Sequence, residues 1–307
     1  MPAKENNSAE DEGHENSKTR SSHTLTSGPA LYLVATPIGN LEDITLRALR
    51  VLKEVDLIAC EDTRHTQKLL NHYGIASRAI SYHQHNEVSR AADLVRKLEQ
   101  GSRIALVSDA GMPGISDPGF SLISLALEHH IEVIPVPGAS AFLTALAASG
   151  LSTDSFCFHG FLPAKHGQRR QVLQNIKRSP QTDVFYEAPH RLRECMEDVV
   201  EVLGWNRQVV IARELTKIHE EFLRGTAAEL LEILSAREEI KGEITLLIAK
   251  LEDGQEASPN ERPLSLARRV QQLIAEEKLD EKAALKKVAK ERRISKSEAY
   301  RELQRSK

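Results

Sequence analysis

Three short loops rich in glycine, proline and aspartate carry the residues of this 307-residue chain that are best suited to bind a ligand. They lie at 36–40, 108–119 and 137–141, and each follows a run of aliphatic residues typical of a strand. Glycine lets the backbone approach a bound molecule, proline fixes φ, and aspartate accepts hydrogen bonds. Open α/β sheets bind ligands at the carboxyl ends of their strands. The three loops together therefore predict a small-molecule site.

The residue types in these loops narrow the choice of ligand. The 36–40 loop lacks the Lys-Ser or Lys-Thr pair of a phosphate-binding P-loop, and its spacing does not match the G-x-G-x-x-G of a dinucleotide fold. ATP and NAD are therefore poor candidates. The 108–119 loop offers backbone groups, Asp109 as an acidic anchor, and Met112 and Ile115 as apolar cover. S-adenosylmethionine fits this description, because it carries ribose hydroxyls, an adenine and a cationic sulfonium.

The elements that must position these loops alternate between strand and helix as far as residue 150. This alternation predicts an α/β fold with a mostly parallel sheet and helices on both faces. After about residue 152, five further strand-like runs indicate a second α/β domain. The predicted divisions are a disordered tail at 1–28, an N-terminal α/β domain at 29–150, a C-terminal α/β domain at 151–252, a linker at 253–262 and a basic helical tail at 263–307.

Composition favours a globular protein, with 40% hydrophobic and 28% charged residues. No signal peptide or apolar run of about 20 residues is present, so we expect a cytoplasmic protein with no membrane partner. Cys60, Cys157 and Cys195 lack the paired spacing of a zinc or redox motif. His83 and His85 have no third ligand spaced to join them, so we expect no metal site.

The basic C-terminal segment stands out against a net charge of −3. Residues 262–307 contain 14 Lys and Arg but only 7 Asp and Glu. Their apolar residues recur at helical spacing, and Ser295 with Glu298 forms a capping-box pattern, so three short helices resembling a helix-turn-helix are predicted. Such a unit favours an anionic partner, although a packing or dimerisation arm is the open alternative.

Several motifs resemble the tetrapyrrole-methylase superfamily. They are Thr-Pro-Ile-Gly-Asn-Leu-Glu-Asp-Ile-Thr at 36–45, Cys-Glu-Asp-Thr-Arg at 60–64, the 108–119 loop and Pro-Gly-Ala-Ser-Ala at 137–141. Tyr-Glu-Ala-Pro-His-Arg at 186–191 and the stretch at 213–221 resemble its branch that 2′-O-methylates a cytidine ribose in 16S ribosomal RNA. The resemblance implies two α/β domains with S-adenosylmethionine in a cleft between them, a homodimer, and 16S ribosomal RNA or the small ribosomal subunit as partner.

Two other functions stay open at this point. One is a C-methyltransferase acting on a tetrapyrrole precursor, and the other is a ribosome-associated binding protein without turnover. The 36–40 loop departs from the G-x-G-P-G-D type found in tetrapyrrole-modifying relatives, which favours RNA as the substrate.

Carried over residue by residue, the resemblance implies the residues that bind the cofactor. Those expected to bind the cofactor are Pro37, Gly39, Ser108, Asp109, Ala110, Gly111, Met112, Pro113, Ile115, Ser140, Ala141, Leu162, Glu243, Ile244 and Thr245. From the residues themselves, the cations after the 160–163 loop and at the start of a later helix suit RNA phosphates. These are Lys165, Arg169, Arg170 and Arg191.

The chemistry of methyl transfer suggests catalytic candidates. A sulfonium is an excellent leaving group, so the enzyme must mainly align the ribose 2′-oxygen with the methyl carbon. A base, or a cation that favours the alkoxide, would activate the weakly nucleophilic hydroxyl. A carboxylate beside an arginine is equally typical of a structural ion pair, and the sequence does not choose among the candidates. They are Glu61, Asp62, Arg64, Glu187, His190, Glu214 and Lys217.

Overall fold

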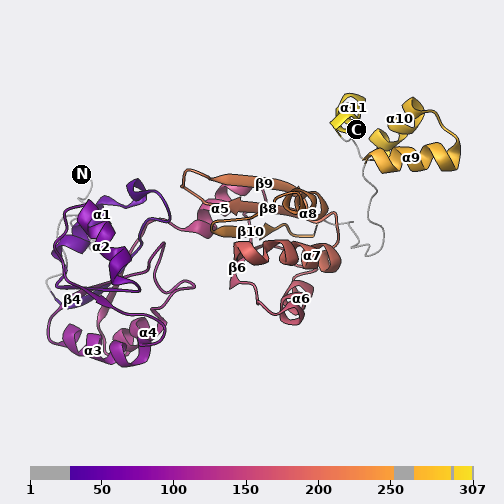
Figure 1. Cartoon of the computed structure of the whole chain (residues 1–307). Coiled ribbons are helices and arrows are strands. Elements are labelled where there is room, and N and C mark those ends of the chain that lie inside the picture. The colour runs from indigo at the N-terminus through magenta and orange to yellow at the C-terminus, as the bar shows by residue number, and fades with distance from the viewer. Residues whose placement is uncertain (1–27, 252–265, 292–293, 306–307) are drawn as a thin grey trace, which may run out of the picture. The chain divides into compact units, whose positions relative to one another are not determined.

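A computed structural model describes residues 28–251, 266–291 and 294–305 (Figure 1). The predicted tail before residue 28 and the predicted linker at 253–262 lie outside these residues. The chain divides into two compact units, one ending at Ser140 and the other beginning at Ala141. The division comes before the predicted one at 150, because helix α5 (Ala141–Ser149) packs against strands of the second sheet. The assignment of this helix to the N-terminal domain was therefore wrong.

The first unit is a five-stranded parallel sheet in the order β3-β2-β4-β1-β5. Most of its strand residues are buried, as expected for parallel strands covered on both faces. Helices α1 and α2 share one apolar cluster with the sheet, and α3 and α4 share another, so helices cover both faces. The elements are β1 (Ala30–Val34), α1 (Leu46–Glu54), β2 (Leu57–Cys60), α2 (Thr63–His72), β3 (Ala79–Ser81), α3 (Glu87–Glu99), β4 (Arg103–Val107), α4 (Phe120–Glu128) and β5 (Glu132–Val136), with a 3-10 turn at Leu41–Asp43.

The second unit contains a mixed five-stranded sheet in the order β6-β7-β10-β8-β9. Only β6 and β7 run parallel, and the other neighbours are antiparallel. Alternate residues of β7, β8 and β10 enter the cluster formed with α6, α7 and α8, while α5 also packs against these strands. The elements are α5, β6 (Phe156–Phe161), α6 (His166–Asn175), β7 (Thr182–Glu187), α7 (Leu192–Leu203), β8 (Gln208–Arg213), β9 (Glu221–Thr226), α8 (Ala227–Ser235) and β10 (Ile244–Ile248), with a 3-10 turn at Pro189–Arg191.

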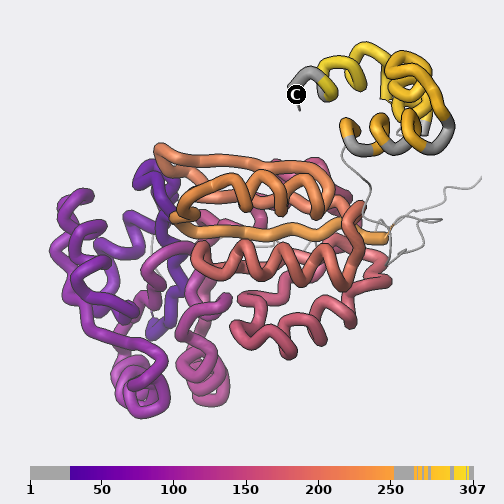
Figure 2. Tube along the Cα trace, turned by 45° about the vertical axis from the view of Figure 1, so that its right-hand side comes forward, coloured from indigo at the N-terminus to yellow at the C-terminus, as the bar shows by residue number. Residues whose placement is uncertain are grey.

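Three short helices close the chain, as predicted (Figure 2). They are α9 (Leu266–Glu277), α10 (Glu281–Glu291) and α11 (Lys296–Arg305), and they share a small core that includes Val270 and Val288. The predicted capping box is present. Ser295 Oγ accepts the backbone N–H of Glu298 at 3.2 Å, and the Glu298 carboxylate accepts the backbone N–H of Ser295 at 2.9 Å. This pairing satisfies two otherwise unpaired donors where α11 begins.

Candidate active site

The three Gly/Pro loops of the first unit meet at one edge of its sheet. They follow β1, β4 and β5, which are adjacent parallel strands, so their carboxyl ends lie side by side. Thr36 and Gly111 exchange backbone hydrogen bonds of 2.9 and 3.0 Å, and Thr36 Oγ1 donates to the carbonyl of Ser108 at 3.1 Å. The third loop joins them through Gly138, which packs on Ala35. The sequence loops are thus parts of one structure.

Glycine is required at particular points of this structure. Gly111 and Gly114 have φ near +80°, which side chains of L-residues rarely adopt. At Gly138 the limit is space, because a Cβ there would lie 2.8 Å from the Cβ of Ala35. Glycine at these positions therefore lets the loops approach one another, or a ligand, more closely than any residue with a side chain would allow.

Replacing Gly138 with alanine should separate two of the loops. Both colliding atoms are fixed to the backbone, so relief requires a backbone shift, which typically costs about 1–3 kcal/mol. We expect G138A to lower the free energy of unfolding by that amount in urea titrations and to weaken S-adenosylmethionine binding about tenfold or more in calorimetry. Gly167→Ala is the control, since a Cβ there meets nothing within 4 Å. Equal affinity of G138A and G167A for S-adenosylmethionine would contradict the prediction that these loops bind it.

Carboxylates gather at the same edge. Asp109 Oδ1 accepts the backbone N–H of Asp62 at 3.2 Å, which ties the loop after β2 to the loop after β4. Burial, reinforced by the charges of Glu61 and Asp109, raises the pKa of Asp117 to about 6. Burial and the charge of Asp109 also raise the pKa of Glu61, against a weaker opposing effect of His83. Such shifts suit groups that exchange protons near neutral pH.

Asp117 was missed as a candidate from the sequence, although it lies within the 108–119 motif. A second aspartate before a proline is typical of a turn, and its pKa depends on Glu61, far away in the chain. The sequence-predicted candidates beside it differ in role. Asp62 begins α2, accepting the backbone N–H of Arg64 at 2.8 Å and pairing with its guanidinium at 2.7 Å. These bonds hold the pKa of Asp62 well below its usual range, which makes it a poor base.

The second unit brings together three of the predicted site residues. Lys217 Nζ lies 2.8 Å from Glu214 Oε1 and 3.2 Å from Glu243 Oε2. Glu214 also accepts the backbone N–H of Glu243 at 2.9 Å, and the hydrogen bond from Lys217 chiefly lowers its pKa. Gly242 makes room for this cluster, since a Cβ there would meet Glu214 Cγ at 2.3 Å. The cluster lies beside the start of β10, where the expected cofactor residues Ile244 and Thr245 are buried.

The other predicted residues of the second unit are placed differently. Glu187 is fully buried, and its carboxylate accepts the backbone N–H of Ala188 and the guanidinium of Arg191, each at 2.7 Å. His190 is exposed on the 3-10 turn that follows β7. Leu162 is buried, so it can contribute only backbone to a ligand in this conformation. Glu187 and Arg191 therefore form a structural pair at the end of β7.

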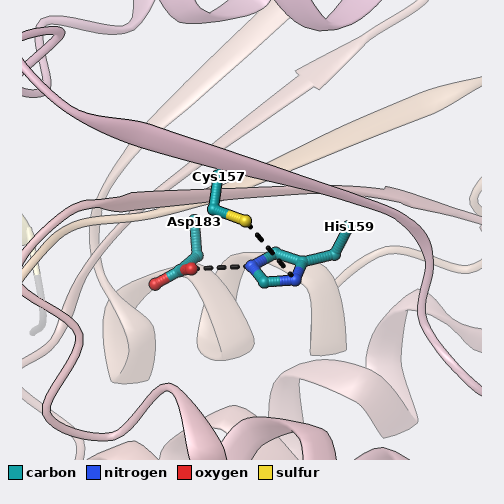
Figure 3. Close-up of side chains that lie close together, drawn as sticks. All are labelled: Cys157, His159 and Asp183. Atoms are coloured by element: carbon teal, nitrogen blue, oxygen red, sulfur yellow. Dashed lines mark hydrogen bonds and ion pairs between the residues drawn. The ribbon is translucent and has the colours of Figure 1, made fainter.

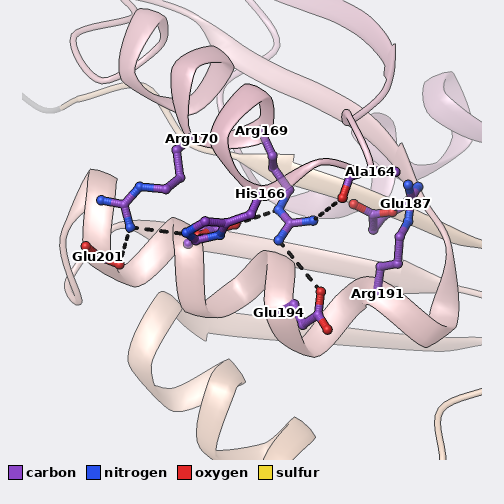
Figure 4. Close-up of polar contacts among 9 residues, drawn as sticks. Ala164, His166, Arg169, Arg170, Glu187, Arg191, Glu194 and Glu201 are labelled. Carbon is purple, nitrogen blue, oxygen red and sulfur yellow. Dashed lines mark hydrogen bonds and ion pairs between the residues drawn. The ribbon is translucent and has the colours of Figure 1, made fainter.

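The basic residues expected to bind RNA do not form one exposed surface, because Arg169 and Arg170 each pair with a carboxylate on helix α7 (Figure 4). Arg169 is 1% exposed and its Nε lies 2.6 Å from the buried carboxylate of Asp198, so its role as a phosphate contact is corrected. Arg170 is half-buried and pairs with Glu201. Lys165 is exposed on the loop before α6. The proposed RNA contact of this region thus depends mainly on Lys165.

No helix among residues 28–251, 266–291 and 294–305 is long and apolar enough to cross a membrane.

The residues of the first unit that are expected to bind the cofactor include both buried and exposed positions. Ile115 is 44% exposed and therefore free to cover a ligand, whereas Pro113 is buried. Ser108 is also buried, and its hydroxyl donates to the carbonyls of Ala110 and Gly111 at 3.2 Å.

The protein-family model described as Tetrapyrrole (Corrin/Porphyrin) Methylases matches residues 30–231 of the chain. The chain therefore belongs to this family. A relative from Halalkalibacterium halodurans named ribosomal RNA small subunit methyltransferase I is 52% identical over 274 residues, 88% of this chain and 93% of the relative. A relative of the same name from Escherichia coli O157:H7 is 49% identical, covering 83% and 88%. Within the family, the chain groups with the proteins of that name.

Solved structures with the same fold include the cobalamin biosynthetic enzyme cobalt precorrin-4 methyltransferase, with a TM-score of 0.54 and 15% identity. The methyltransferase CobJ has a TM-score of 0.56 and 18% identity. Each alignment covers 72% of this chain and 94% of the other. These matches confirm the predicted family and the α/β fold class. The names of the relatives are those of methyltransferases.

Proposed function

We propose that this chain is a methyltransferase that uses S-adenosylmethionine to 2′-O-methylate the ribose of a cytidine in 16S ribosomal RNA. The observation that carries the proposal is the joining of the 36–40, 108–119 and 137–141 loops at one sheet edge, in a chain about half identical to relatives named ribosomal RNA small subunit methyltransferase I. The alternative substrate, a tetrapyrrole precursor, is not favoured by these relatives.

The residues at the sheet edge fit a cationic cofactor. Asp109 and Asp117 place carboxyl groups on the loop that Thr36 holds in place, and Met112 and Ile115 offer apolar surface. S-adenosylmethionine, when bound, supplies a methyl group on a positively charged sulfur. The carboxylates attract that charge, and the glycines let backbone groups reach the ribose and adenine. The remaining cofactor residues named above, including Ser140, Ala141 and Glu243, stay predictions.

Proton removal from the ribose hydroxyl is assigned to the carboxylates of the first unit. Asp117 is the preferred acceptor, because a pKa of about 6 leaves it ionised at neutral pH yet basic enough to take a proton. Glu61 acts through its charge, which helps raise that pKa. Asp62, Glu187 and Glu214 are held by strong partners and are less suited to the role.

RNA binding is assigned to the C-terminal helices and Lys165. The sequence at 262–307 is strongly basic, and sequence-independent attraction to phosphates falls steeply with salt. We propose 16S ribosomal RNA or the small ribosomal subunit as partner, the cytoplasm as location and a homodimer as assembly. The names of the relatives support the RNA partner, an RNA partner of that kind supports the cytoplasm, and the family resemblance of the sequence supports the dimer.

The proposed activity is tested with labelled S-adenosylmethionine and purified small ribosomal subunits. We expect label on a single cytidine, and mapping by nuclease resistance should place it on the 2′-oxygen. Label on a porphyrinoid but not on RNA would support the tetrapyrrole alternative. Cofactor binding without transfer to either would support a binding protein.

Deleting residues 262–307 tests the RNA-binding assignment separately. We expect affinity for small subunits to fall by about tenfold or more at low salt and its salt dependence to become shallower. Calorimetry should give the same S-adenosylmethionine affinity for the full and shortened chains. Unchanged RNA affinity after the deletion would show that these helices pack or assemble the protein instead.

A further inference from the structure

Cys157, His159 and Asp183 form a cluster in the second unit that the proposed methyl transfer does not use (Figure 3). Cys157 and His159 lie two residues apart on β6, so they share one face of the sheet. Asp183 on β7 is the register partner of Cys157. Because β6 is an edge strand, Cys157 remains partly exposed. The three side chains thus combine a reachable thiol, an imidazole and a buried carboxylate.

The hydrogen bonds link the three side chains in a row, from Asp183 through His159 to Cys157. His159 Nε2 lies 2.7 Å from Asp183 Oδ1, and His159 Nδ1 lies 3.9 Å from Cys157 Sγ. The ring stacks on Phe185 with centroids 4.6 Å apart and planes inclined by 12°, which fixes its orientation. Toward a carboxylate oxygen that accepts, Nε2 is the donor and carries the ring proton. The unprotonated Nδ1 is then left to accept the proton of the thiol.

The carboxylate at the far end of this hydrogen-bonded chain has a buried cation as its electrostatic partner. Asp183 is 1% exposed, and its second oxygen has no hydrogen-bond partner among the described residues. The buried guanidinium of Arg207 attracts it electrostatically. The hydrogen bond between His159 Nε2 and the Asp183 carboxylate therefore fixes the ring tautomer that leaves Nδ1 facing Cys157.

We propose that Cys157 is a nucleophilic thiol, activated by His159 and with Asp183 as positioning residue, that reacts with small peroxides. A nucleophile, a base and a third group that orients the base make up the arrangement known from thiol and hydroxyl nucleophiles. The other two cysteines provide a contrast. Cys60 and Cys195 are buried, and burial raises the pKa of both thiols.

The reaction balances with hydrogen peroxide as the co-reactant. The thiol proton moves to His159 Nδ1, and the thiolate sulfur attacks one peroxide oxygen. A sulfur–oxygen bond forms as the oxygen–oxygen bond breaks, and the departing hydroxide takes the proton from His159 to become water. The sulfur loses two electrons and becomes a sulfenic acid, while the peroxide is reduced.

A metal ion is the competing occupant of the cluster. The ligand atoms lie within 4.8 Å of one another, which would suit a thiolate, imidazole and carboxylate donor set. The observed contacts use both nitrogens of His159, one toward each partner, and a single ion can bind only one of them. An ion bound through Nε2 would displace the 2.7 Å hydrogen bond between His159 and Asp183. The geometry therefore favours the proton relay.

The test measures modification of Cys157 in the reduced full-length protein under native conditions. Peroxide is added with a cyclic diketone that traps sulfenic acid, and the modified peptides are counted by mass spectrometry over time. We expect H159Q to slow the reaction at neutral pH by about tenfold or more. His129→Gln is the matched control, because His129 also pairs with a carboxylate, at 2.8 Å from Glu99, and should leave the rate unchanged.

Further arms decide between the explanations. D183N should also slow the reaction, and because that change is buried, H159Q keeps the test valid if D183N fails to fold. The pH at which the modification rate reaches half its maximum should be lower in the wild type than in H159Q. Arg207, the charged neighbour of Asp183, is unchanged in both proteins and does not account for the difference. Equal rates and midpoints in wild type and H159Q would overturn the proposal. A bound metal found by elemental analysis, with a faster reaction after chelation, would overturn it in favour of a metal site.

Discussion

Asp117→Asn is expected to slow methyl transfer by on the order of a hundredfold or more, since a positioned general base typically contributes that much. The wild-type rate should rise with pH through about 6, where Asp117 loses its proton, and D117N should lose this rise. Single-turnover rates with small ribosomal subunits over a pH series measure both effects. Asp93→Asn is the matched control, because it makes the same chemical change on the exposed side of α3.

The same substitution should not destabilise the protein. Burial raises the pKa of Asp117 in the folded state, so the stability associated with its protonated form is present below the ordinary value of 3.8 and lost as pH rises through about 6. Asparagine cannot ionise, so D117N should melt at or above the wild-type temperature at pH 7. The difference should vanish under acidic conditions below that ordinary value. A large drop in melting temperature at pH 7 would instead assign Asp117 a structural role.

Glu61→Gln separates the two carboxylates. Removing the charge of Glu61 takes away one cause of the raised pKa of Asp117, so the pH midpoint of the rate should move downward while the rate above it changes less than in D117N. If E61Q abolishes the rate and D117N does not, Glu61 is the proton acceptor and the roles are reversed.

The local signals of the sequence predicted the parts of the fold that depend on them. Strands β1, β2, β4 and β5 are aliphatic runs ended by glycine, proline or polar residues, a pattern that indicates buried strands from sequence alone. Strand β3 gives no such signal, because it has only three residues, ends in Ser81 and is half-buried. The alanine-rich pattern of helix α5 does not indicate which sheet its apolar residues meet, which is why the predicted boundary at 150 came after this helix.

The candidate site likewise has features that local sequence predicts and features that depend on the folded structure. The loops could be predicted because glycine and proline report their own backbone requirements, as at Gly111 with φ of +80°. The properties of Asp117 and Arg169 could not, because each depends on a residue brought close by the fold. Glu61 raises the pKa of Asp117, and Asp198 on α7 pairs with Arg169 on α6. An arginine within a polar helix pattern is typical of a surface.

Arg169→Met is expected to lower the free energy of unfolding by about 3–5 kcal/mol, the usual cost of leaving one member of a buried ion pair alone. The buried carboxylate of Asp198 would then keep His166 at 2.9 Å and the guanidinium of Arg170 at 4.0 Å as its remaining neighbours in this cluster. Urea denaturation measures the change. Arg170→Met is the matched control, because its pair with Glu201 is more exposed and should matter by no more than about 1 kcal/mol.

A double mutant shows whether the cost comes from the unpaired charge. Replacing Arg169 with methionine and Asp198 with leucine removes both charges, and a buried pair can often be exchanged for apolar residues with little loss. We therefore expect the double mutant to recover much of the stability lost in R169M, a coupling that a mutant cycle measures directly. RNA affinity of folded R169M should equal that of wild type, since the guanidinium is buried. Weaker RNA binding by a fully stable R169M would restore Arg169 as a phosphate contact.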